Sequence, residues 1–287
     1  MFIAILVAIL FGIVEGVTEW LPVSSTGHII LLNDFLPLDI SPAVYDLFEI
    51  VIQLGAILAV IVLFFHKLNP FSPKKNTVQK KDTWSLWFKV VLAVIPSAAI
   101  GLLLDDPLDS FLRGTAVLGT NLNVVVVALA LIGYGIAFIA VEKRNQANAF
   151  SIQTVGQIDY KTALLIGAFQ CLSLIPGTSR SGATILGAIL LGVSRPAGAE
   201  FSFFLAIPTM LGASALKILD FLSEGLSMNA TEIAVLITSF VVSFIVSVLV
   251  IKALMEYVRK HSFAVFGGYR ILLGIAVLGY FLIKAAI

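Results

Sequence analysis

The distribution of apolar residues along the chain predicts six membrane-spanning helices. An α-helix needs about 20 predominantly apolar residues to cross the roughly 30 Å hydrocarbon core of a bilayer. Segments of this kind lie at 43–65, 87–104, 116–141, 199–221, 233–252 and 264–283. The pattern therefore predicts an all-α polytopic membrane protein.

Two further apolar stretches are interrupted before they are long enough to cross. Residues 2–14 and 163–175 are each followed by a short Ser/Gly-rich segment and then by a return arm, at 29–36 and 183–193. At about 1.5 Å per residue, neither return arm reaches across the hydrocarbon. Each interrupted stretch is therefore predicted to be a re-entrant helical hairpin with its polar segment at the tip.

The two tips are the most informative segments of the chain. They read Pro22-Val-Ser-Ser-Thr-Gly-His28 and Pro176-Gly-Thr-Ser-Arg-Ser-Gly-Ala-Thr184. Lipid offers no hydrogen bonds, so non-helical backbone at membrane depth is tolerated only where it is buried in protein or lines a watery cavity. We therefore expect the tips to form a polar pocket within the membrane.

Composition supports the membrane class. Hydrophobic residues make up 59% of the chain and charged residues 12%, which is well below the roughly 25% charged content of soluble domains. A net charge of +1 gives no basic excess, so nucleic acid is not an expected partner.

The apolar start has no basic n-region, so we do not expect a removable signal peptide. The single cysteine, Cys171, cannot form an intramolecular disulfide.

Basic residues in the short loops predict the orientation, because Lys and Arg favour the cytoplasmic side. They gather in alternate loops as Lys67, Lys74, Lys75, Lys80, Lys81, Lys89, Lys143, Arg144, Lys161, Arg195, Arg259 and Lys260. The intervening loop with Asp105, Asp106 and Asp109 has only Arg113. The basic loops are predicted to be cytoplasmic, which leaves both termini outside.

An offset of 155 residues relates the two hairpins. It pairs Gly12 with Gly167, Glu15 with Gln170, Thr18 with Ser173, Ser24 with Ser179, Ser25 with Arg180, Thr26 with Ser181 and Gly27 with Gly182. Each half holds one hairpin and three spans, and because three is odd the halves have opposite orientation. The chain is thus predicted to be a single integral membrane domain, 1–287, built as an inverted-topology repeat of 1–145 and 160–287. Such repeats place binding sites near the midplane.

Glu15 and Glu19 are the first candidate ligands. Their i, i+4 spacing puts both carboxylates on one helix face, where two like charges in an apolar segment need a cation or hydrogen-bond donors. Carboxylate oxygens suit Mg²⁺ or Ca²⁺, and zinc is disfavoured because the sequence has no His/Cys cluster. The alternative is that one glutamate simply lies near the water interface.

Arg180 is the candidate phosphate ligand. An arginine inside the membrane is a functional-site hypothesis by default, and its planar guanidinium matches phosphate oxygens. The neighbouring Ser and Gly residues precede a predicted helix, whose N-terminus favours an anion. The alternative, Arg180 as an internal counter-ion for Glu15 or Glu19, is compatible with this role.

Ser24, Ser25 and Thr26 are candidate hydroxyl groups at the other tip, and His28 follows them. A serine can act as a nucleophile when a nearby base activates it, although helix capping is the commoner use of any single hydroxyl. Glu49, Gln53 and Gln170 are expected to support the site from behind or to bond between helices. Gly55 and Gly212 are expected to allow close helix packing.

The motifs resemble those of the undecaprenyl-diphosphate phosphatases, also called bacitracin-resistance proteins. Glu15-Gly-Val-Thr-Glu19 supplies the E-x-x-x-E pattern, and Pro176 to Thr184 supplies P-G-x-S-R-S-x-x-T without departure. The resemblance covers essentially the whole chain. It implies hydrolysis of undecaprenyl diphosphate to undecaprenyl phosphate, which recycles the lipid carrier for peptidoglycan and other envelope polymers and confers bacitracin resistance.

The resemblance also implies roles for individual residues. Ser25 is the expected nucleophile, Arg180 the phosphate clamp, and Glu15 and Glu19 the metal or acid/base groups. The diphosphate is expected to contact Arg180, Ser24, Thr26, Ser179, Ser181 and Thr184, with His28 assisting catalysis. The family further implies divalent-cation dependence, the bacterial cytoplasmic (inner) membrane, and a site open to the external side.

Several alternatives stay open at this point. A transporter or polyprenyl-phosphate flippase would use the same architecture, because inverted repeats with broken helices are typical of transporters. The attacking group is either Ser25 or a water held by Glu19. The sequence leaves the metal, the preferred lipid chain length and the oligomeric state undecided, with a homodimer as one alternative.

Overall fold

Six helices of the structure are long and apolar enough to cross a membrane. They are α3 (Pro42–Leu63), α5 (Thr77–Gly114), α6 (Leu122–Asn145), α9 (Arg195–Ser223), α10 (Ala230–Lys260) and α11 (Ala264–Ala286). The structure is a computed structural model and describes all residues except 118–119, 146–149, 224–226 and 287. The number and order of the spans agree with the sequence, so the all-α polytopic class is confirmed.

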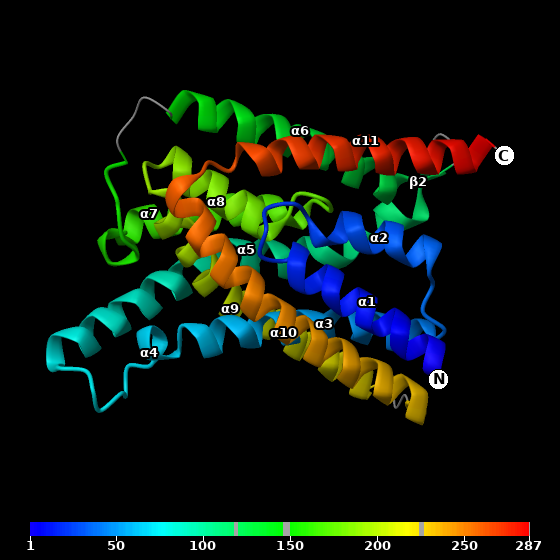
Figure 1. Cartoon of the computed structure of the whole chain (residues 1–287), viewed down its shortest axis with the longest axis horizontal. Coiled ribbons are helices and arrows are strands. Elements are labelled where there is room, and N and C mark those ends of the chain that lie inside the picture. The colour runs from blue at the N-terminus through cyan, green and yellow to red at the C-terminus, as the bar shows by residue number, and fades with distance from the viewer. Residues whose placement is uncertain (118–119, 146–149, 224–226, 287) are drawn as a thin grey trace.

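The motifs lie in two pairs of shorter helices. α1 (Phe2–Thr18) is followed by α2 (Ser25–Phe35), while α7 (Tyr160–Gln170) and the 3-10 turn η2 (Cys171–Leu174) are followed by α8 (Arg180–Leu190). The α1–α2 pair comes from the end of the molecule that holds the N-terminus, and α7–α8 comes from the opposite end (Figure 1). The depth of either pair in a bilayer stays a prediction. The hydroxyl residues Ser25, Thr26, Ser181 and Thr184 lie in the return helices, whereas Ser24, Thr178 and Ser179 remain in the loops.

Three predicted spans are wrong at their ends. The span at 233–252 is too short, because α10 continues to Lys260 through the residues predicted to form a basic loop. The span at 87–104 is part of α5, which begins ten residues earlier because Asn76 and Gln79 form a reciprocal capping box, with Gln79 N donating to Asn76 Oδ1 at 2.9 Å. At its other end α5 continues to Gly114, so the predicted loop at 105–114 is helical. The span at 116–141 instead starts with a short hairpin of β1 (Ala116–Val117) and β2 (Thr120–Asn121), and α6 follows it.

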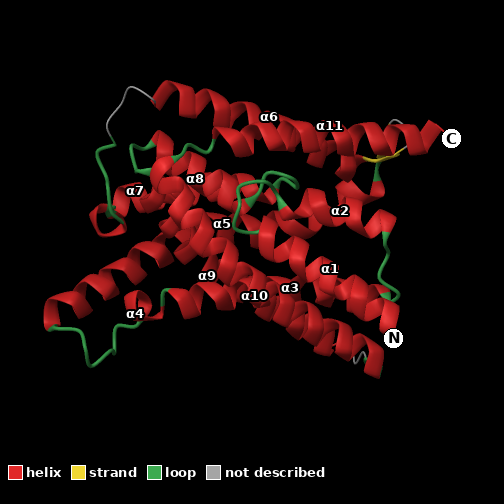
Figure 2. Ribbon diagram, in the orientation of Figure 1, coloured by secondary structure: helices red, strands yellow, loops and turns green. Residues whose placement is uncertain are grey.

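Two remaining elements are short. α4 (Phe65–Leu68) follows α3 after a break at Phe64, and the 3-10 turn η1 (Val155–Gln157) precedes α7. Apart from the β1–β2 hairpin and the isolated Ile152–Val193 bridge, the regular elements of the described residues are helices, as Figure 2 shows.

The helix that leads into each motif packs against a long helix from the other half of the chain. α1 packs against α10, and α7, its counterpart at the 155-residue offset, packs against α5. α6 and α11 lie side by side along most of their length (Figure 1). This is the arrangement expected when two halves are related by a two-fold axis. The division into 1–145 and 160–287 stays a prediction.

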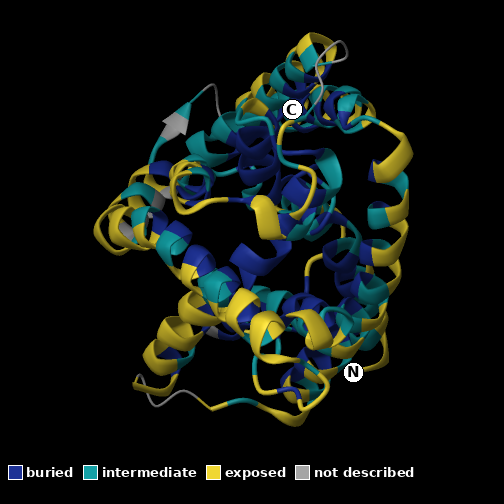
Figure 3. Ribbon diagram, turned by 90° about the vertical axis from the view of Figure 1, so that its left-hand side faces the viewer, coloured by how far each residue is buried: buried dark blue, intermediate teal, exposed yellow. Residues whose placement is uncertain are grey.

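The outer surface is apolar where lipid would contact it. Leu102 and Leu103 on α5, Leu249 on α10 and Leu272 on α11 are all more than 60% exposed, and contiguous apolar surface of this kind marks a membrane or protein contact. Viewed from the left of Figure 1, exposed residues follow the periphery and buried residues lie inside (Figure 3). The helices therefore bury their polar groups against one another.

The basic loops meet at one end of the molecule, which we call the basic end. It is formed by the loops and helix ends that carry most of the basic residues predicted to be cytoplasmic. It is the end with α4 and the start of α5, opposite both termini (Figure 1). There the buried Glu142 accepts bonds from Arg195 Nε at 2.9 Å and from Phe263 N at 2.8 Å. This carboxylate joins the C-terminal part of α6 to the beginnings of α9 and α11.

The two glycines singled out in the sequence behave differently. A Cβ at Gly55 would overlap the Phe240 carbonyl oxygen of α10, so the predicted close packing is confirmed. A Cβ at Gly212 would meet nothing within 4 Å, so the prediction is wrong there. Gly212 is an exposed residue on α9 and faces away from other helices.

Gly55→Ala should therefore destabilise the protein by roughly 1–3 kcal/mol, because the added methyl group forces α3 away from α10. Gly212→Ala is the matched control and should leave stability unchanged or raise it by up to about 1 kcal/mol, because Ala favours a helix. Thermal unfolding in detergent measures both. Equal midpoints for the two variants would contradict the close approach at Gly55.

Candidate active site

The two motif loops end in the same unusual backbone conformation. Ser24 has φ 69° and Ser179 has φ 68°, and these are the positive-φ residues other than glycine in the described part of the chain. The two serines are related by the 155-residue offset and precede the first residues of α2 and α8. A positive φ costs of order 1–3 kcal/mol in a non-glycine residue and is found at functional sites. It turns the N-terminus of each short helix toward the junction of the loops.

Glu19 lies at that junction and connects the two motifs. Ser25 Oγ donates to Glu19 Oε2 at 3.0 Å, and a terminal nitrogen of Arg180 donates to Glu19 Oε1 at 2.8 Å. The side chains of Glu19 and Arg180 are 12% and 11% exposed. The sequence alternative of Arg180 as an internal counter-ion is thus realised for Glu19. The same contact brings a hydroxyl, a base and a cation together.

Some polar atoms at this junction are buried and have no partner. They are Glu15 Oε1, Ser24 Oγ and the second terminal nitrogen of Arg180, NH1. Buried polar groups nearly always form hydrogen bonds, and each exception needs an explanation. An arginine donor, a hydroxyl and a carboxylate oxygen without partners in the protein are the kinds of group that an anionic ligand and its counter-ion can contact.

Three hydroxyls of the second motif bond within the protein, those of Ser179, Ser181 and Thr184. Ser179 Oγ accepts from Gly182 N at 3.2 Å and caps α8. Ser181 Oγ donates to the Glu19 carbonyl oxygen at 3.1 Å, while Thr184 Oγ1 lies 2.6 Å from Ser202 Oγ. These bonds fix the start of α8 against the first motif. Direct contact of these hydroxyls with a ligand stays a prediction.

His28 and Thr26 lie on the outer side of the first motif. His28 Nδ1 is 2.7 Å from the Ser24 carbonyl oxygen, and because a carbonyl only accepts, Nδ1 carries the proton. Nε2 is 2.7 Å from the Tyr269 hydroxyl, and the two rings are stacked. Thr26 is exposed. His28 therefore braces the Ser24 backbone, and a direct role in catalysis stays a prediction.

The supporting residues predicted from the sequence take different positions. Glu49 is near enough to Glu15 for their charges to interact, which agrees with a place behind the site. Gln53, one turn further along α3, is half-buried. Gln170 donates to Ser97 Oγ at 2.6 Å and to Thr209 Oγ1 at 3.2 Å. Its hydrogen bonds thus join α7 to α5 and α9 rather than reaching the motif residues.

Sequence reasoning missed Arg270. This fully buried residue of α11 donates from NH1 to the Pro22 carbonyl oxygen at 3.1 Å and from NH2 to the Gly177 and Thr178 carbonyl oxygens at 2.8 and 2.9 Å. One guanidinium thus joins both motif loops. The signal was an arginine in the middle of an apolar span, the same feature that identified Arg180.

Trp20 closes the site on another side. It is fully buried, its ring meets Phe203 edge to face at 5.3 Å, and the Arg180 guanidinium lies 5.9 Å from the ring centre. A cation over an indole face is stabilised by the ring quadrupole. Trp20 therefore helps to hold Arg180 while the arginine also contacts Glu19.

The carboxylates fit a divalent cation that is shared with a ligand. Among the described residues there is no group of three or more His, Cys, Asp and Glu side chains able to hold a metal. Mg²⁺ commonly binds through one or two carboxylates plus phosphate oxygens. Glu15, with one unpartnered oxygen, and Glu19 supply such a pair.

Comparison with known proteins agrees with this geometry. The family model "Bacitracin resistance protein BacA" matches residues 8–276. The chain is 54% identical to "Undecaprenyl-diphosphatase" of Enterococcus faecalis (strain ATCC 700802 / V583), over 96% of both proteins. It is also 54% identical to "Undecaprenyl-diphosphatase 1" of Clostridioides difficile (strain 630), over 96% of this chain and 95% of that protein. For "Undecaprenyl-diphosphatase" of Streptococcus thermophilus (strain ATCC BAA-250 / LMG 18311) the identity is 52%, over 98% and 95%.

The family match covers both motifs, five of the six apolar helices in full and the first part of α11. The chain belongs to the family of the bacitracin resistance protein BacA.

Proposed function

We propose that this chain hydrolyses undecaprenyl diphosphate to undecaprenyl phosphate and phosphate at the junction of its two motifs. The observation that carries the proposal is Glu19, which accepts from both Ser25 and Arg180 and leaves NH1 of the arginine unpartnered. A nucleophile, its base and a phosphate ligand are the parts that phosphoryl transfer requires. The family and the names of the relatives support the same activity.

In the first step, Ser25 attacks the terminal phosphorus of the diphosphate. Glu19 takes the hydroxyl proton through the 3.0 Å hydrogen bond as the new bond to the Ser25 Oγ forms. The bond between this phosphorus and the bridging oxygen breaks, and undecaprenyl phosphate leaves with the bonding electrons. The proton passes from Glu19 to the leaving phosphate. Arg180 NH1 and the N-termini of α2 and α8 stabilise the phosphate charge.

In the second step, water attacks the phosphorylated serine. Glu19, again a carboxylate, takes a proton from the water, and the bond between phosphorus and the Ser25 Oγ breaks. Inorganic phosphate is released, and the serine oxygen recovers its proton from Glu19. The same base serves both steps because it remains within hydrogen-bond distance of Ser25.

Glu15 and Glu19 are the residues that would hold a divalent cation, Mg²⁺ or Ca²⁺. When bound, the cation neutralises charge on the diphosphate oxygens. Glu15 suits this role because one of its buried oxygens has no partner within the protein. The polyprenyl tail stays in the bilayer, so only the diphosphate needs a polar pocket.

We place the protein in the bacterial cytoplasmic membrane, with the basic end in the cytoplasm and the site open to the external side. The clustering of Lys and Arg at one end supports this orientation. The alternative of a transporter or flippase is not supported, because the relatives described above carry the name of a diphosphatase.

Ser25→Ala and Arg180→Ala should each reduce phosphate release from undecaprenyl diphosphate by roughly 10³-fold or more, because each removes one part of the reacting site. Purified protein in detergent is assayed, with size-exclusion chromatography to check assembly. Ser223→Ala, at the exposed end of α9, is the control and should keep full activity. Near-normal turnover of both site variants would show that the assignment is wrong.

Acid quenching after one turnover should trap phosphate on Ser25. If active protein hydrolyses the substrate but never carries phosphate on Ser25, the attacking group is an activated water instead.

Chelation with EDTA should abolish hydrolysis, and added Mg²⁺ or Ca²⁺ should restore it. Glu15→Gln should raise the cation concentration for half-maximal activity by roughly tenfold or more, because it removes a charged ligand. The matched control is Glu256→Gln on the exposed end of α10, which should not change the requirement. Full activity after exhaustive chelation would rule out the proposed cation.

Arg270→Lys should lower kcat by roughly 10- to 100-fold with little change in KM. A single ammonium cannot reach all three carbonyl oxygens that the guanidinium binds, and small displacements of reacting groups cost catalysis steeply. Steady-state kinetics on folded protein measure the effect. If kcat of the folded fraction is unchanged, Arg270 stabilises the fold and does not position the loops.

A further inference from the structure

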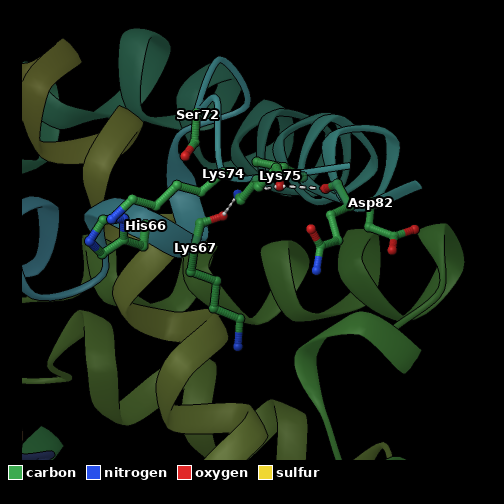
Figure 4. Close-up of a pocket in the computed structure, with 8 residues that line it drawn as sticks. His66, Lys67, Ser72, Lys74, Lys75 and Asp82 are labelled. Carbon is green, nitrogen blue, oxygen red and sulfur yellow. Dashed lines mark hydrogen bonds between the residues drawn. The ribbon is translucent and has the colours of Figure 1, made fainter. Parts of the chain in front are cut away.

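A cavity lined by polar residues lies at the basic end, and none of the motif residues lines it. Its volume is about 460 Å³, and it lies between α4, the following loop and the first turns of α5. The residues that matter here are His66, Lys67, Lys74, Lys75, Asp82 and Thr83. Figure 4 shows them around the opening, with Lys74 and His66 on one side and Asp82 on the other. Basic side chains thus outnumber the single carboxylate.

Lys75 is held in this cavity by neutral groups. Its ammonium donates to the Lys67 carbonyl oxygen at 3.0 Å and to Thr83 Oγ1 at 2.7 Å. Burial lowers the pKa of Lys75 from its ordinary value. Lys74 is exposed beside it. Within the described part of the chain, neither ammonium has a carboxylate within salt-bridge distance, whereas Lys67 is paired with Glu200 at 2.6 Å. Among the described residues, the cavity therefore holds two ammonium groups without a salt-bridge partner, against the single carboxylate of Asp82.

Exposed aromatic rings border the cavity. Phe71, Trp84 and Phe88 are 76%, 44% and 61% exposed, and their rings form a row with centre distances of 5.7 and 6.3 Å. Phe71 and Trp84 are chain neighbours of the cavity residues Ser72 and Thr83. Tryptophan is enriched at membrane interfaces, where an apolar ring meets the headgroup region. The row is suited to the boundary between headgroups and acyl chains.

The positive surface continues into a neighbouring cavity of about 700 Å³. Lys67 lines both, and the second cavity adds Lys252, Arg259 and Lys260 against Glu200 and Glu256. Its other lining includes apolar side chains of α3 and α10, such as Leu63 and Met255. Basic groups, open space and apolar surface therefore adjoin along this end of the protein.

We propose that the cavity around Lys74 and Lys75 binds the phosphate-bearing headgroup of an acidic membrane phospholipid. The two ammonium groups contact the phosphate, and the aromatic row contacts the upper acyl chains. The source is a lipid rather than free phosphate, because a soluble ion would make no use of the exposed aromatic row. Basic pockets between helix ends at the cytoplasmic face are known lipid-headgroup sites in membrane proteins. The proposal does not depend on the reaction at Ser25.

The test is a lipid titration of the purified full-length protein in detergent, read by its thermal unfolding midpoint. Phosphatidylglycerol should raise the midpoint in a saturable manner, and phosphatidylcholine should raise it much less. Inorganic phosphate and glycerol phosphate form the third arm and should have little effect at the same concentrations. An equal response to phosphatidylcholine would overturn the proposal, and so would a full response to soluble phosphate.

Paired variants locate the site. Lys74→Gln with Lys75→Gln should weaken the apparent affinity for phosphatidylglycerol by about 25-fold, because each lysine near an anionic lipid surface contributes roughly fivefold. The control pair, Lys143→Gln with Arg144→Gln, removes two exposed charges at the same end outside the cavity and should change it less than about twofold. Equal losses in both pairs would overturn the assignment to the cavity.

Two further variants keep the test decisive if the double variant does not assemble. Lys74→Gln alone removes the charge of an exposed side chain and should lower the affinity for phosphatidylglycerol by about fivefold. Lys74→Arg with Lys75→Arg keeps both charges and should retain the phosphatidylglycerol response. Loss in the arginine pair together with an unchanged single variant would overturn the proposal. Hydrolysis of the diphosphate should stay unchanged in all of them.

Discussion

The structure depends on how the polar groups of the two motif loops find hydrogen-bond partners inside an apolar protein. Lipid supplies no hydrogen bonds, so each loop that interrupts a helix needs partners from the protein itself. The loops supply them to each other: Glu19 binds Arg180 and the backbone around Glu19 binds Ser181, while Arg270 joins the carbonyl oxygens of both. The requirement for internal partners therefore brings the two motifs together and forms the site.

The two motifs share a scaffold and differ in chemistry. Ser24 and Ser179 have the same strained backbone conformation, and each sets the first residue of a short helix toward the junction. The first residue is a serine in one copy and an arginine in the other. This difference places a hydroxyl opposite a cation, with one glutamate between them. The helix N-termini add to the attraction for phosphate from both sides.

The two proposed phosphate sites use different physics. At the motif junction Glu19 and Arg180 are largely buried, and their polar contacts are stronger than in bulk water because the local dielectric is low. At the basic end the lysines lie near water, and attraction depends on several charges and on neighbouring aromatic rings. The first arrangement suits a reaction that needs precise positions. The second suits retention of a lipid whose headgroup can move.

The sequence alone determined the class of the protein, the number and order of its spans, and the residues of both motifs. Hydropathy depends on local composition, and the motif residues stand out because polar groups are costly in a membrane. The sequence-based prediction was wrong at the start of α5, where polar residues form a capped helix. It was also wrong at the start of the next span, where Ala116–Val117 and Thr120–Asn121 form paired strands instead of a helix.

Only the tertiary structure decided which groups contact one another. Glu19 and Arg180 are 161 residues apart, and Arg270 is more than 90 residues from either loop carbonyl it binds. It also separated Gly55, which another helix approaches, from Gly212, which faces open space, although both are glycines in apolar helices. Spacing along one helix can be read from a sequence, whereas contacts between helices depend on how all of them pack together.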